Sequence, residues 1–305
     1  MRNRIVVGHD GSSQADDALA LAARLASGTG ARLTLAYIYH QEPTFEAQDR
    51  GYRRELRDRA AATLGPALEK LPPGLLADSG AFPSSTAAHG LRDLARDERA
   101  DLIVIGSTHR GPIGSVLIGG VGELLCSGAP CAVAVAPRGM REQAGAVTSR
   151  VGVAFDGSKE SEVALRGAVT LADSLDAQLA AITVHENTRS PLGSSARRAD
   201  AAIRSQLSDA LSRISPQAQA DHELLRGDPV ERLTEAAATI DMLVMGSRGY
   251  GPIRQTLLGG VSSKLMRSAE CPVVVIPRGA PPPEAGALKA ASGSHSATST
   301  STDAR

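Results

Sequence analysis

The sequence has few aromatic residues: only 2% of its 305 residues are Phe, Trp or Tyr, and none is Trp. Proteins that bind single-stranded nucleic acid commonly stack bases on such rings, so the composition disfavours this class. The charges also balance, with 33 Lys and Arg against 33 Asp and Glu. The sequence therefore gives no electrostatic argument for nucleic acid or for an acidic membrane surface as a partner.

Cysteines and long apolar runs are scarce as well. The three cysteines, Cys126, Cys131 and Cys271, form no C-x-x-C pair, so neither a disulfide framework nor a zinc site is expected. Cys131 and Cys271 occupy equivalent places before apolar runs and are expected to be buried thiols. No run reaches the ~18–20 apolar residues that cross a bilayer, and the N-terminus enters a strand pattern without a signal-peptide core. We therefore expect a cytoplasmic protein without a membrane partner.

The sequence contains an internal repeat instead. Five landmarks recur in the same order in two halves. In the first half they are IVVGHDGS, ARLTLAYIY, ADLIVIGS, RGPIGSVLIGGV and APCAVAVAPRG; in the second they are VGVAFDGS, AQLAAITVH, IDMLVMGS, YGPIRQTLLGGV and AECPVVVIPRG. The offset is 146 residues between Asp10 and Asp156 and 140 between Gly106 and Gly246, so the first half carries six extra residues in its middle.

Each half has the pattern of an α/β unit. Short Val, Ile and Leu runs alternate with segments whose apolar residues recur at helical spacing, such as Ala15, Ala18, Leu19 and Ala22. The runs LIVI, MLVM, AVAVA and VVVI are continuous, which is typical of strands covered on both faces. The order β-α-β-α-β-α-β-α-β predicts two tandem doubly wound domains, each a five-stranded parallel sheet with helices on both faces.

The repeat also sets the expected domain boundaries. We place the first domain at residues 1–139, a linker at 140–148 and the second domain at 149–279. Residues 280–305 are Pro-rich and then a low-complexity run of Ala, Ser and Thr. Because such a composition buries little apolar surface, we expect a disordered tail there.

Ligands of a doubly wound sheet bind at the carboxyl ends of its strands, which directs attention to the glycines after the fourth strand of each half. In the second half, GSRGYGP begins at Gly246 and GGVSSK begins at Gly259. Glycines let backbone amides approach a ligand, and the first amides of the following helix are unpaired. The partial positive charge of the helix N-terminus and the hydroxyls of Ser262 and Ser263 complete a predicted phosphate site.

The spacing G-x2-G-x9-G is neither a P-loop nor the G-x-G-x-x-G dinucleotide fingerprint. Placed after the fourth strand, and preceded by a first strand that ends in D-G-S, it resembles the universal stress protein family. The resemblance covers both halves nearly end to end through D-G-S, G-S-x-G, L-L-G-G-V-S-S and C-P-V-V-V-I-P. It implies an adenine nucleotide α-hydrolase-like fold. It also implies an adenine nucleotide, ATP with or without Mg, in each binding-competent domain.

The resemblance assigns nucleotide-contacting positions in both halves. In the second half these are Ala154, Asp156, Val184, Gly246, Ser247, Arg248, Gly249, Gly259, Gly260, Val261 and Ser262. In the first half they are Gly8, Asp10, Ile38, Gly106, Ser107, His109, Gly119, Gly120 and Val121, followed by Gly122. Both halves depart from the family pattern at Gly120 and Gly260, where a Ser or Thr is usual. That departure removes one side-chain donor and leaves the backbone amides.

The two halves differ within this loop. His109 replaces the second glycine, Gly122 stands for Ser262, and Glu123 stands for Ser263. A carboxylate in the first helical turn stabilises an empty helix terminus by about 0.3–1 kcal/mol, but it opposes a phosphate there. We therefore expect the second half to be the stronger nucleotide site.

Three functions remain open from the residues alone. The leading hypothesis is an adenine-nucleotide-binding stress or regulatory protein that is not an enzyme, because no catalytic constellation accompanies the loop. His9 beside Asp10, for instance, is replaced by Phe155 in the second half. The alternatives are a non-binding scaffold, in which the D-G-S residues are only Asx-turns and the glycines only turn residues, and a slow ATPase.

The resemblance also implies association through the fifth strand. AVAVA and VVVI would then pair across the two halves into a pseudo-dimer within one chain, and a homodimer is a further possibility.

Overall fold

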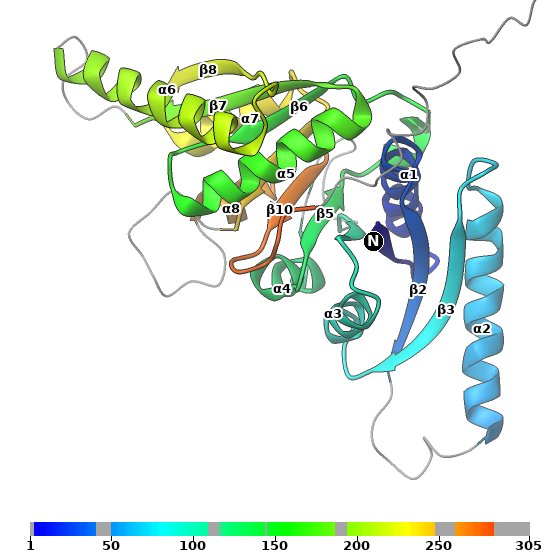
Figure 1. Cartoon of the computed structure of the whole chain (residues 1–305). Helices are drawn as coiled ribbons and strands as arrows, with labels where there is room; N and C mark the ends of the chain where they lie inside the picture. Colours follow the sequence, from blue (N-terminus) through cyan, green and yellow to red (C-terminus); the bar gives the residue numbers. More distant parts are fainter. Residues whose placement is uncertain are drawn as a thin grey trace, which may run out of the picture.

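The computed structural model of the chain (Figure 1) describes residues 3–40, 50–108, 116, 118–143, 145–186, 194–247 and 260–283. Strands and helices alternate along both halves. The first half contains β1 (Arg4–Gly8), α1 (Ser13–Thr29), β2 (Arg32–His40), α2 (Arg50–Glu69), β3 (Ala77–Ser84), α3 (Ala87–Asp97), β4 (Leu102–Gly106), α4 (Gly120–Gly128) and β5 (Ala132–Ala136). The second half contains β6 (Arg150–Ala154), α5 (Lys159–Leu175), β7 (Gln178–His185), α6 (Ser194–Ile214), β8 (Asp221–Arg226), α7 (Pro229–Ala237), β9 (Met242–Gly246), α8 (Gly260–Leu265) and β10 (Val273–Ile276).

The strands of both halves join into one ten-stranded sheet. Its order is β3-β2-β1-β4-β5-β10-β9-β6-β7-β8. Within each half the strands are parallel, as predicted, and β5 and β10 pair antiparallel, with Val274 opposite Ala134. The expected pairing of AVAVA with VVVI is therefore present, and it fuses the two predicted five-stranded sheets into one.

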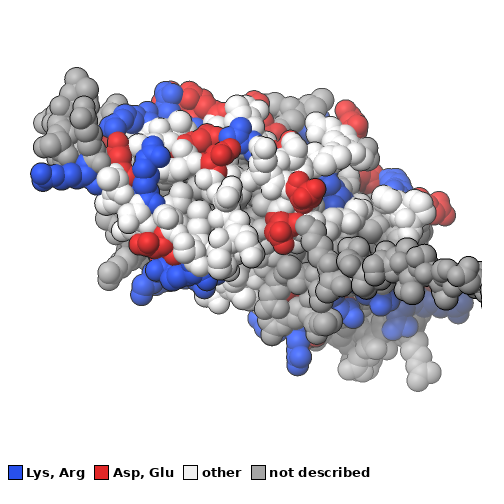
Figure 2. Space-filling view, turned by 45° about the horizontal axis from the view of Figure 1, so that its top comes forward, with Lys and Arg blue, Asp and Glu red and all other residues white. Residues whose placement is uncertain are grey.

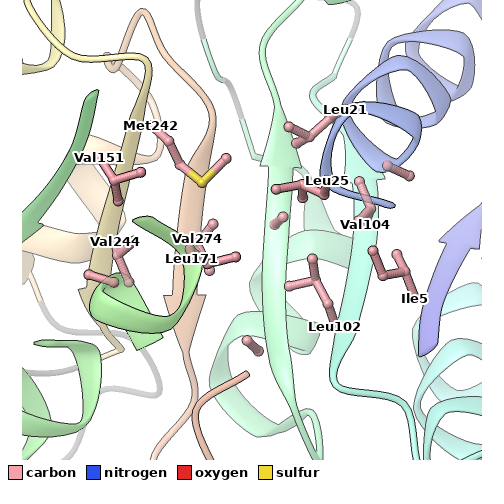
Figure 3. Packing of buried hydrophobic residues seen from close by; sticks show 14 of the residues in the cluster. Ile5, Leu21, Leu25, Leu102, Val104, Val151, Leu171, Met242, Val244 and Val274 are labelled. Carbon is pink, nitrogen blue, oxygen red and sulfur yellow. The ribbon is translucent and has the colours of Figure 1, made fainter. Parts of the chain in front are cut away.

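The two faces of the sheet bury alternate side chains of the same strands. In β1, Ile5 and Val7 face the layer of α1, α2, α5 and α6, whereas Val6 faces the layer of α3, α4, α7 and α8. Figure 3 shows the first layer, where Leu25 and Leu171 pack over the strands. Burial on both faces explains why these strands are continuous apolar runs. The core also runs across both halves, so they form one packed body.

The connection between the halves is packed rather than loose. After β5 the chain forms a 3₁₀ helix, η2 (Met140–Gln143), and Met140 is buried. The fully buried carboxylate of Asp17 in α1 accepts hydrogen bonds from the backbone amides of Gly139 and Arg141, each at 2.9 Å. The predicted linker is therefore anchored to the first half along its first residues.

The first residues of the segment expected to be a disordered tail pack against the second half. Residues 280–283 are described, and the rings of Pro282 and Pro283 lie against Gly167 of α5. A side chain at Gly167 would meet these rings, which explains how the prolines pack there. The remainder of the predicted tail lies outside the described residues.

Each half has a point where the sheet order reverses. β1 lies between β2 and β4, and β6 lies between β7 and β9. The connections leaving such neighbours go to opposite faces, so a crevice forms beyond their carboxyl ends. The residues after β1 and β4, and after β6 and β9, are therefore placed where a ligand can enter.

Candidate functional site

A cavity of about 360 Å³ lies at the reversal point of the first half. It is bounded by the ends of β1, β2 and β4 and by the starts of α1, α3 and α4. The structure brings together these predicted first-half positions: Gly8, Asp10, Ile38, Gly106, Ser107, Gly119, Gly120, Val121 and Gly122. The remaining predicted position, His109, lies outside the described residues.

Sequence reasoning missed several residues of this cavity. Leu91 and Ala87 of α3 form part of its wall, and His9, Gln14 and Thr108 also line it. His9 and Thr108 adjoin predicted positions on the same strand ends, so a window of one residue on either side would have found them. The α3 residues carry no local signal, because only the fold brings that helix to the cavity.

The D-G-S segment forms the same turn in both halves. The Oδ1 atoms of Asp10 and Asp156 each accept a hydrogen bond from the amide two residues on, at 3.0 Å in both cases. Gly11 and Gly157 have φ values of 86° and 75°, a region that other residues adopt only with strain. Both aspartates therefore form Asx-turns, which occupy one oxygen of each carboxylate.

The serine of the same segment caps the helix that follows. Ser12 Oγ accepts a hydrogen bond from the amide of Ala15 at 3.2 Å, and Ser158 Oγ accepts one from Ser161 at 3.1 Å. N-cap serines satisfy one of the unpaired amides at a helix start. The D-G-S loop is thus held rigidly at the mouth of the crevice in each half.

The glycines of the first-half loop have different roles. A side chain on Gly106 would collide with the backbone carbonyl of Gln14, so this glycine allows β4 to approach α1. A side chain on Gly119 would meet the Thr108 methyl group at 2.6 Å. Among the described residues, no atom lies within 4 Å of the position that a Cβ of Gly120 would take, and the same holds for Gly260 in the second half. Gly120 therefore borders open space in the cavity.

The N-terminus of α4 points its backbone amides toward this space. Gly119 is the N-cap, and it provides no side-chain hydrogen bond to the helix. The first amide bonded back to the N-cap carbonyl is that of Glu123, at 2.9 Å from the oxygen of Gly119. Helix geometry leaves the amides of Gly120, Val121 and Gly122 without intrahelical partners. Together with the helix dipole, they favour an anion at this end of α4.

Two hydroxyls of the first-half cavity lack a hydrogen-bond partner within the described part of the chain, namely Ser107 Oγ and Thr108 Oγ1. The second half differs here, because Ser247 Oγ accepts a hydrogen bond from the amide of Arg278 at 3.1 Å. A buried hydroxyl without a partner is costly, so these two groups suit a polar ligand.

His9 is the most buried ionisable residue that lines the cavity, with 4% of its surface exposed. Burial lowers the pKa of its imidazole, and the neighbouring Asp16 carboxylate, 3.4 Å from Nε2, partly opposes that effect. Asp16 is also paired with Lys70 at 2.7 Å. Phe155 takes the place of His9 in the second half and is fully buried. His9 thus acts foremost as a neutral core side chain that accepts a hydrogen bond from Gly11.

The second half repeats the same scaffold. Asp156, Val184, Gly246 and Gly260 lie at the corresponding strand ends and helix start, together with Ala154, Ser247, Val261 and Ser262. The predicted positions Arg248, Gly249 and Gly259 lie outside the described residues. Ser262 Oγ donates a hydrogen bond to the carbonyl oxygen of Gly246 at 3.0 Å. The Ser262 hydroxyl therefore donates to the protein backbone, whereas the sequence predicted that it would donate to a phosphate.

The loop that leads into α4 reaches across to the second half. The amide of Val116 donates to the carbonyl of Ala269 at 2.8 Å, and that of Ile118 donates to Met266 at 3.0 Å. In addition, Arg267 Nη2 lies 3.0 Å from Glu123 Oε1. The residues that follow α8 thus contact the segment that leads into α4.

Further properties concern the described residues as a whole. Cys126, Cys131 and Cys271 are free and buried, and burial raises the pKa of the Cys131 and Cys271 thiols to about 12. In this part of the chain, no group of three His, Cys, Asp or Glu side chains gathers to hold a metal ion. None of the described helices combines the length and the apolar character that crossing a membrane requires. Acidic and basic side chains are interspersed on the face shown in Figure 2.

Comparison with known proteins identifies the family. The model of the universal stress protein family matches residues 1–137 and 148–277. The chain belongs to the universal stress protein family. A universal stress protein of Mycolicibacterium smegmatis is 27% identical over 288 residues, which span 89% of this chain and 96% of that protein. A universal stress protein of Mycobacterium tuberculosis is 25% identical over 285 residues, again 89% of this chain and 96% of the relative.

Solved structures agree on the fold. A universal stress protein from Archaeoglobus fulgidus superposes with a TM-score of 0.69 at 19% identity, covering 92% of this chain and all of that one. A functionally unknown protein from Pseudomonas aeruginosa gives a TM-score of 0.61 at 16% identity, covering 90% of this chain and 92% of that one. The tandem α/β architecture is therefore shared with other universal stress proteins.

Proposed function

We propose that this universal stress protein is a cytoplasmic regulator that binds an adenine nucleotide, ATP with or without Mg²⁺, at the sheet reversal point of its domains. The observation that carries the proposal is the first-half cavity, where open space at Gly120 meets the uncapped amide end of α4. Buried and free cysteines fit a reducing compartment.

The chemistry of the cavity matches the parts of a nucleotide. The amides of Gly120 and Val121 and the helix dipole suit phosphate oxygens. The unpartnered hydroxyls of Ser107 and Thr108 offer further donors beside the loop. The side chains of Ile38 and Leu91 line the same cavity and give it an apolar surface against which a base can pack.

We infer that the bound nucleotide changes the contacts of the protein and that the protein does not hydrolyse it. Hydrolysis needs a group that activates water beside the phosphates. The imidazole of His9 is held by Asp16 and by the amide of Gly11, and one carboxylate oxygen of Asp10 is used in its turn. A slow ATPase is the alternative that this argument disfavours, and phosphate release above background would revive it.

The second half is the stronger site in this proposal, on the sequence difference at Gly249 and Ser263; the third difference, Ser262, does not count toward it because its hydroxyl donates to the Gly246 carbonyl. The pairing of Glu123 with Arg267 reduces the expected repulsion between Glu123 and a phosphate in the first half, because Arg267 offsets the charge of Glu123 and draws its side chain toward the second half. A homodimer would use a surface other than the inner edges of β5 and β10, since these strands already pair with each other. The outer edge strands β3 and β8 are the ends of the sheet.

Calorimetric titration of the whole chain with ATP tests the proposal. We expect saturable binding of ATP. Gly260→Glu should weaken this binding most, and Gly120→Glu added to it should weaken the binding further, because both changes put bulk and negative charge into the open space. Gly65→Glu in α2 is the matched control: this glycine also has nothing within 4 Å of the Cβ position, and it does not line the cavity. A folded chain that binds no ATP would favour the scaffold function instead.

A further inference from the structure

A second and larger cavity, of about 710 Å³, lies beside α1 and shares no lining residue with the first. Its walls come from α1, from the end of α2, from the segment that joins the two halves and from the last turn of α5. It therefore lies where the first half, the linker and the second half meet. Ligand sites are frequent at such domain junctions, and this volume falls in their usual range.

The walls of this junction cavity are largely hydrocarbon. Leu19 and Ala20 of α1 contribute to one side, and Leu71 follows α2 on another. Leu175 enters from the second half. Val147 of the linker lines the cavity with 77% of its surface exposed, which is high for a large apolar side chain. An apolar body in the cavity would cover these side chains and remove them from water.

Three cations line the same cavity, and two of them already have partners. Lys70 Nζ lies 2.7 Å from Asp16, and Arg141 Nη1 lies 3.1 Å from the buried Asp17. Arg24 has no carboxylate within 4 Å among the described residues. Of these three cations, Arg24 is therefore the one without an ion-pair partner in the described part of the chain.

Arg24 also has unused hydrogen-bonding capacity. Its Nη2 donates to the carbonyl of Gln143 at 2.9 Å, but its Nε is buried and has no partner in the described chain. The carboxylate of Asp241 attracts the Arg24 guanidinium electrostatically. It accepts its own hydrogen bonds from Ser149 and from the amide of Arg150. A buried guanidinium donor without a partner is costly, and a charged acceptor would satisfy it.

Thr148 is a second and independent feature. Its side chain lines the cavity, only 3% of the residue is exposed, and Oγ1 has no hydrogen-bond partner in the described part of the chain. Buried hydroxyls without a partner are uncommon in folded proteins. The junction cavity thus contains two unsatisfied polar groups, Arg24 Nε and Thr148 Oγ1, among apolar walls.

We propose that the junction cavity binds a small amphipathic carboxylate, with the carboxylate at Arg24 and Thr148 and the apolar body along Leu19, Leu71 and Val147. A single guanidinium without an ion-pair partner suits one carboxylate better than a triphosphate. This site is separate from the proposed nucleotide site. Because its walls come from both halves and the linker, a bound carboxylate would stabilise the junction.

Decanoate is a suitable probe, used below the concentration at which it forms micelles and titrated calorimetrically into the whole chain saturated with ATP. We expect one decanoate per chain. Arg24→Gln should weaken binding about tenfold, as expected for loss of a charge-assisted hydrogen bond, and Thr148→Val about threefold. Decanol, which keeps the apolar body and lacks the charge, should bind about tenfold more weakly. Arg213→Gln is the matched control, since this exposed arginine of α6 pairs with Glu162 outside the cavity.

Specific outcomes would overturn the proposal. Equal affinity for decanol and decanoate would show an apolar cavity without anion recognition, and unchanged binding in Arg24→Gln would exclude the assigned cation. Absence of decanoate binding, or its displacement by ATP, would equally refute a separate carboxylate site. If Arg24→Gln does not fold, the comparison of decanol with decanoate on the unsubstituted chain decides the question alone. A failed ATP titration leaves these results unaffected, so the two proposals fail separately.

Discussion

The guanidinium of Arg267, just after α8 in the second half, lies 3.0 Å from the carboxylate of Glu123 in the first turn of α4. The two residues are 144 positions apart in the chain. Glu123 is the residue whose negative charge suggested a weak nucleotide site in the first half. The second half therefore supplies the cation that offsets this charge, and it does so beside two backbone hydrogen bonds from Val116 and Ile118.

Removal of Arg267 should expose the charge of Glu123 to a bound phosphate. In a Gly260→Glu background, which isolates the first-half site, we expect Arg267→Ala to weaken ATP binding about threefold to fivefold, the range of a surface charge effect. Glu123→Gln added to Arg267→Ala should restore the affinity. Since both side chains are more than 40% exposed, the stability should change by less than about 1 kcal/mol. Identical ATP affinities in all three proteins would show that this ion pair has no effect on the site.

Gly120 and Gly106 should respond in opposite ways to the same substitution. Gly120→Ala places a methyl group in open space at the start of a helix, so we expect unchanged or slightly higher thermal stability. Gly106→Ala drives a methyl group into the Gln14 carbonyl and should destabilise the fold by about 2 kcal/mol or more. Thermal unfolding followed by far-ultraviolet circular dichroism checks both. Equal losses would contradict the distinction between a packing glycine and a ligand-facing one.

Much of the fold follows from local patterns in the sequence. The order of strands and helices and the parallel pairing within each half agree with prediction because they depend on periodicity and on the repeat. The pairing of β5 with β10 is expected from the family resemblance, and the structure adds that it is antiparallel. Nine first-half positions given by the family resemblance meet around one cavity. The role of Ser262 differs from the prediction, because its hydroxyl donates a hydrogen bond to the carbonyl oxygen of Gly246.

The features that the sequence did not reveal are contacts between distant segments that break the repeat. Asp17 corresponds to Val163 by the offset of the D-G-S segments, so nothing in the comparison of halves marks it as an anchor for Arg141. Arg267 likewise corresponds to Ser127. The junction cavity depends on the linker, which has no counterpart in the repeat. Such contacts need the three-dimensional arrangement of both halves before any residue pattern can indicate them.

Asp17 should be the main anchor of the linker. Asp17→Ala leaves the amides of Gly139 and Arg141 without their acceptor and should cost about 3 kcal/mol in the free energy of unfolding. Arg141→Ala should cost about 1 kcal/mol or less, because that side chain is 38% exposed and its backbone amide stays bonded. Urea unfolding measures both, with the exposed Glu142→Ala as control. A loss for Asp17→Ala no larger than the control would show that the linker is held by other contacts.

His9 should make stability depend on pH on the acid side. Burial holds its pKa in the folded chain below the unfolded value of 6.5, so the folded protein binds fewer protons than the unfolded one in the window beneath pH 6.5. The stabilisation is therefore complete above pH 6.5, and it declines as the pH falls from 6.5 toward the folded pKa. The steepest possible slope from this one group is about 1.4 kcal/mol per pH unit.

The second half suggests the variant that tests this dependence, because Phe155 fills the place of His9 without a titrating group. His9→Phe removes the acceptor of the Gly11 amide, so its stability at neutral pH should fall by about 1 kcal/mol. The informative quantity is the slope: between pH 6.5 and 5, urea unfolding of His9→Phe should lose less stability per pH unit than that of the unsubstituted chain. Leu76→Gln, at an exposed position without a titrating group, should keep the original slope. A His9→Phe slope as steep as the original would mean that the folded chain protonates His9 as readily as the unfolded one does.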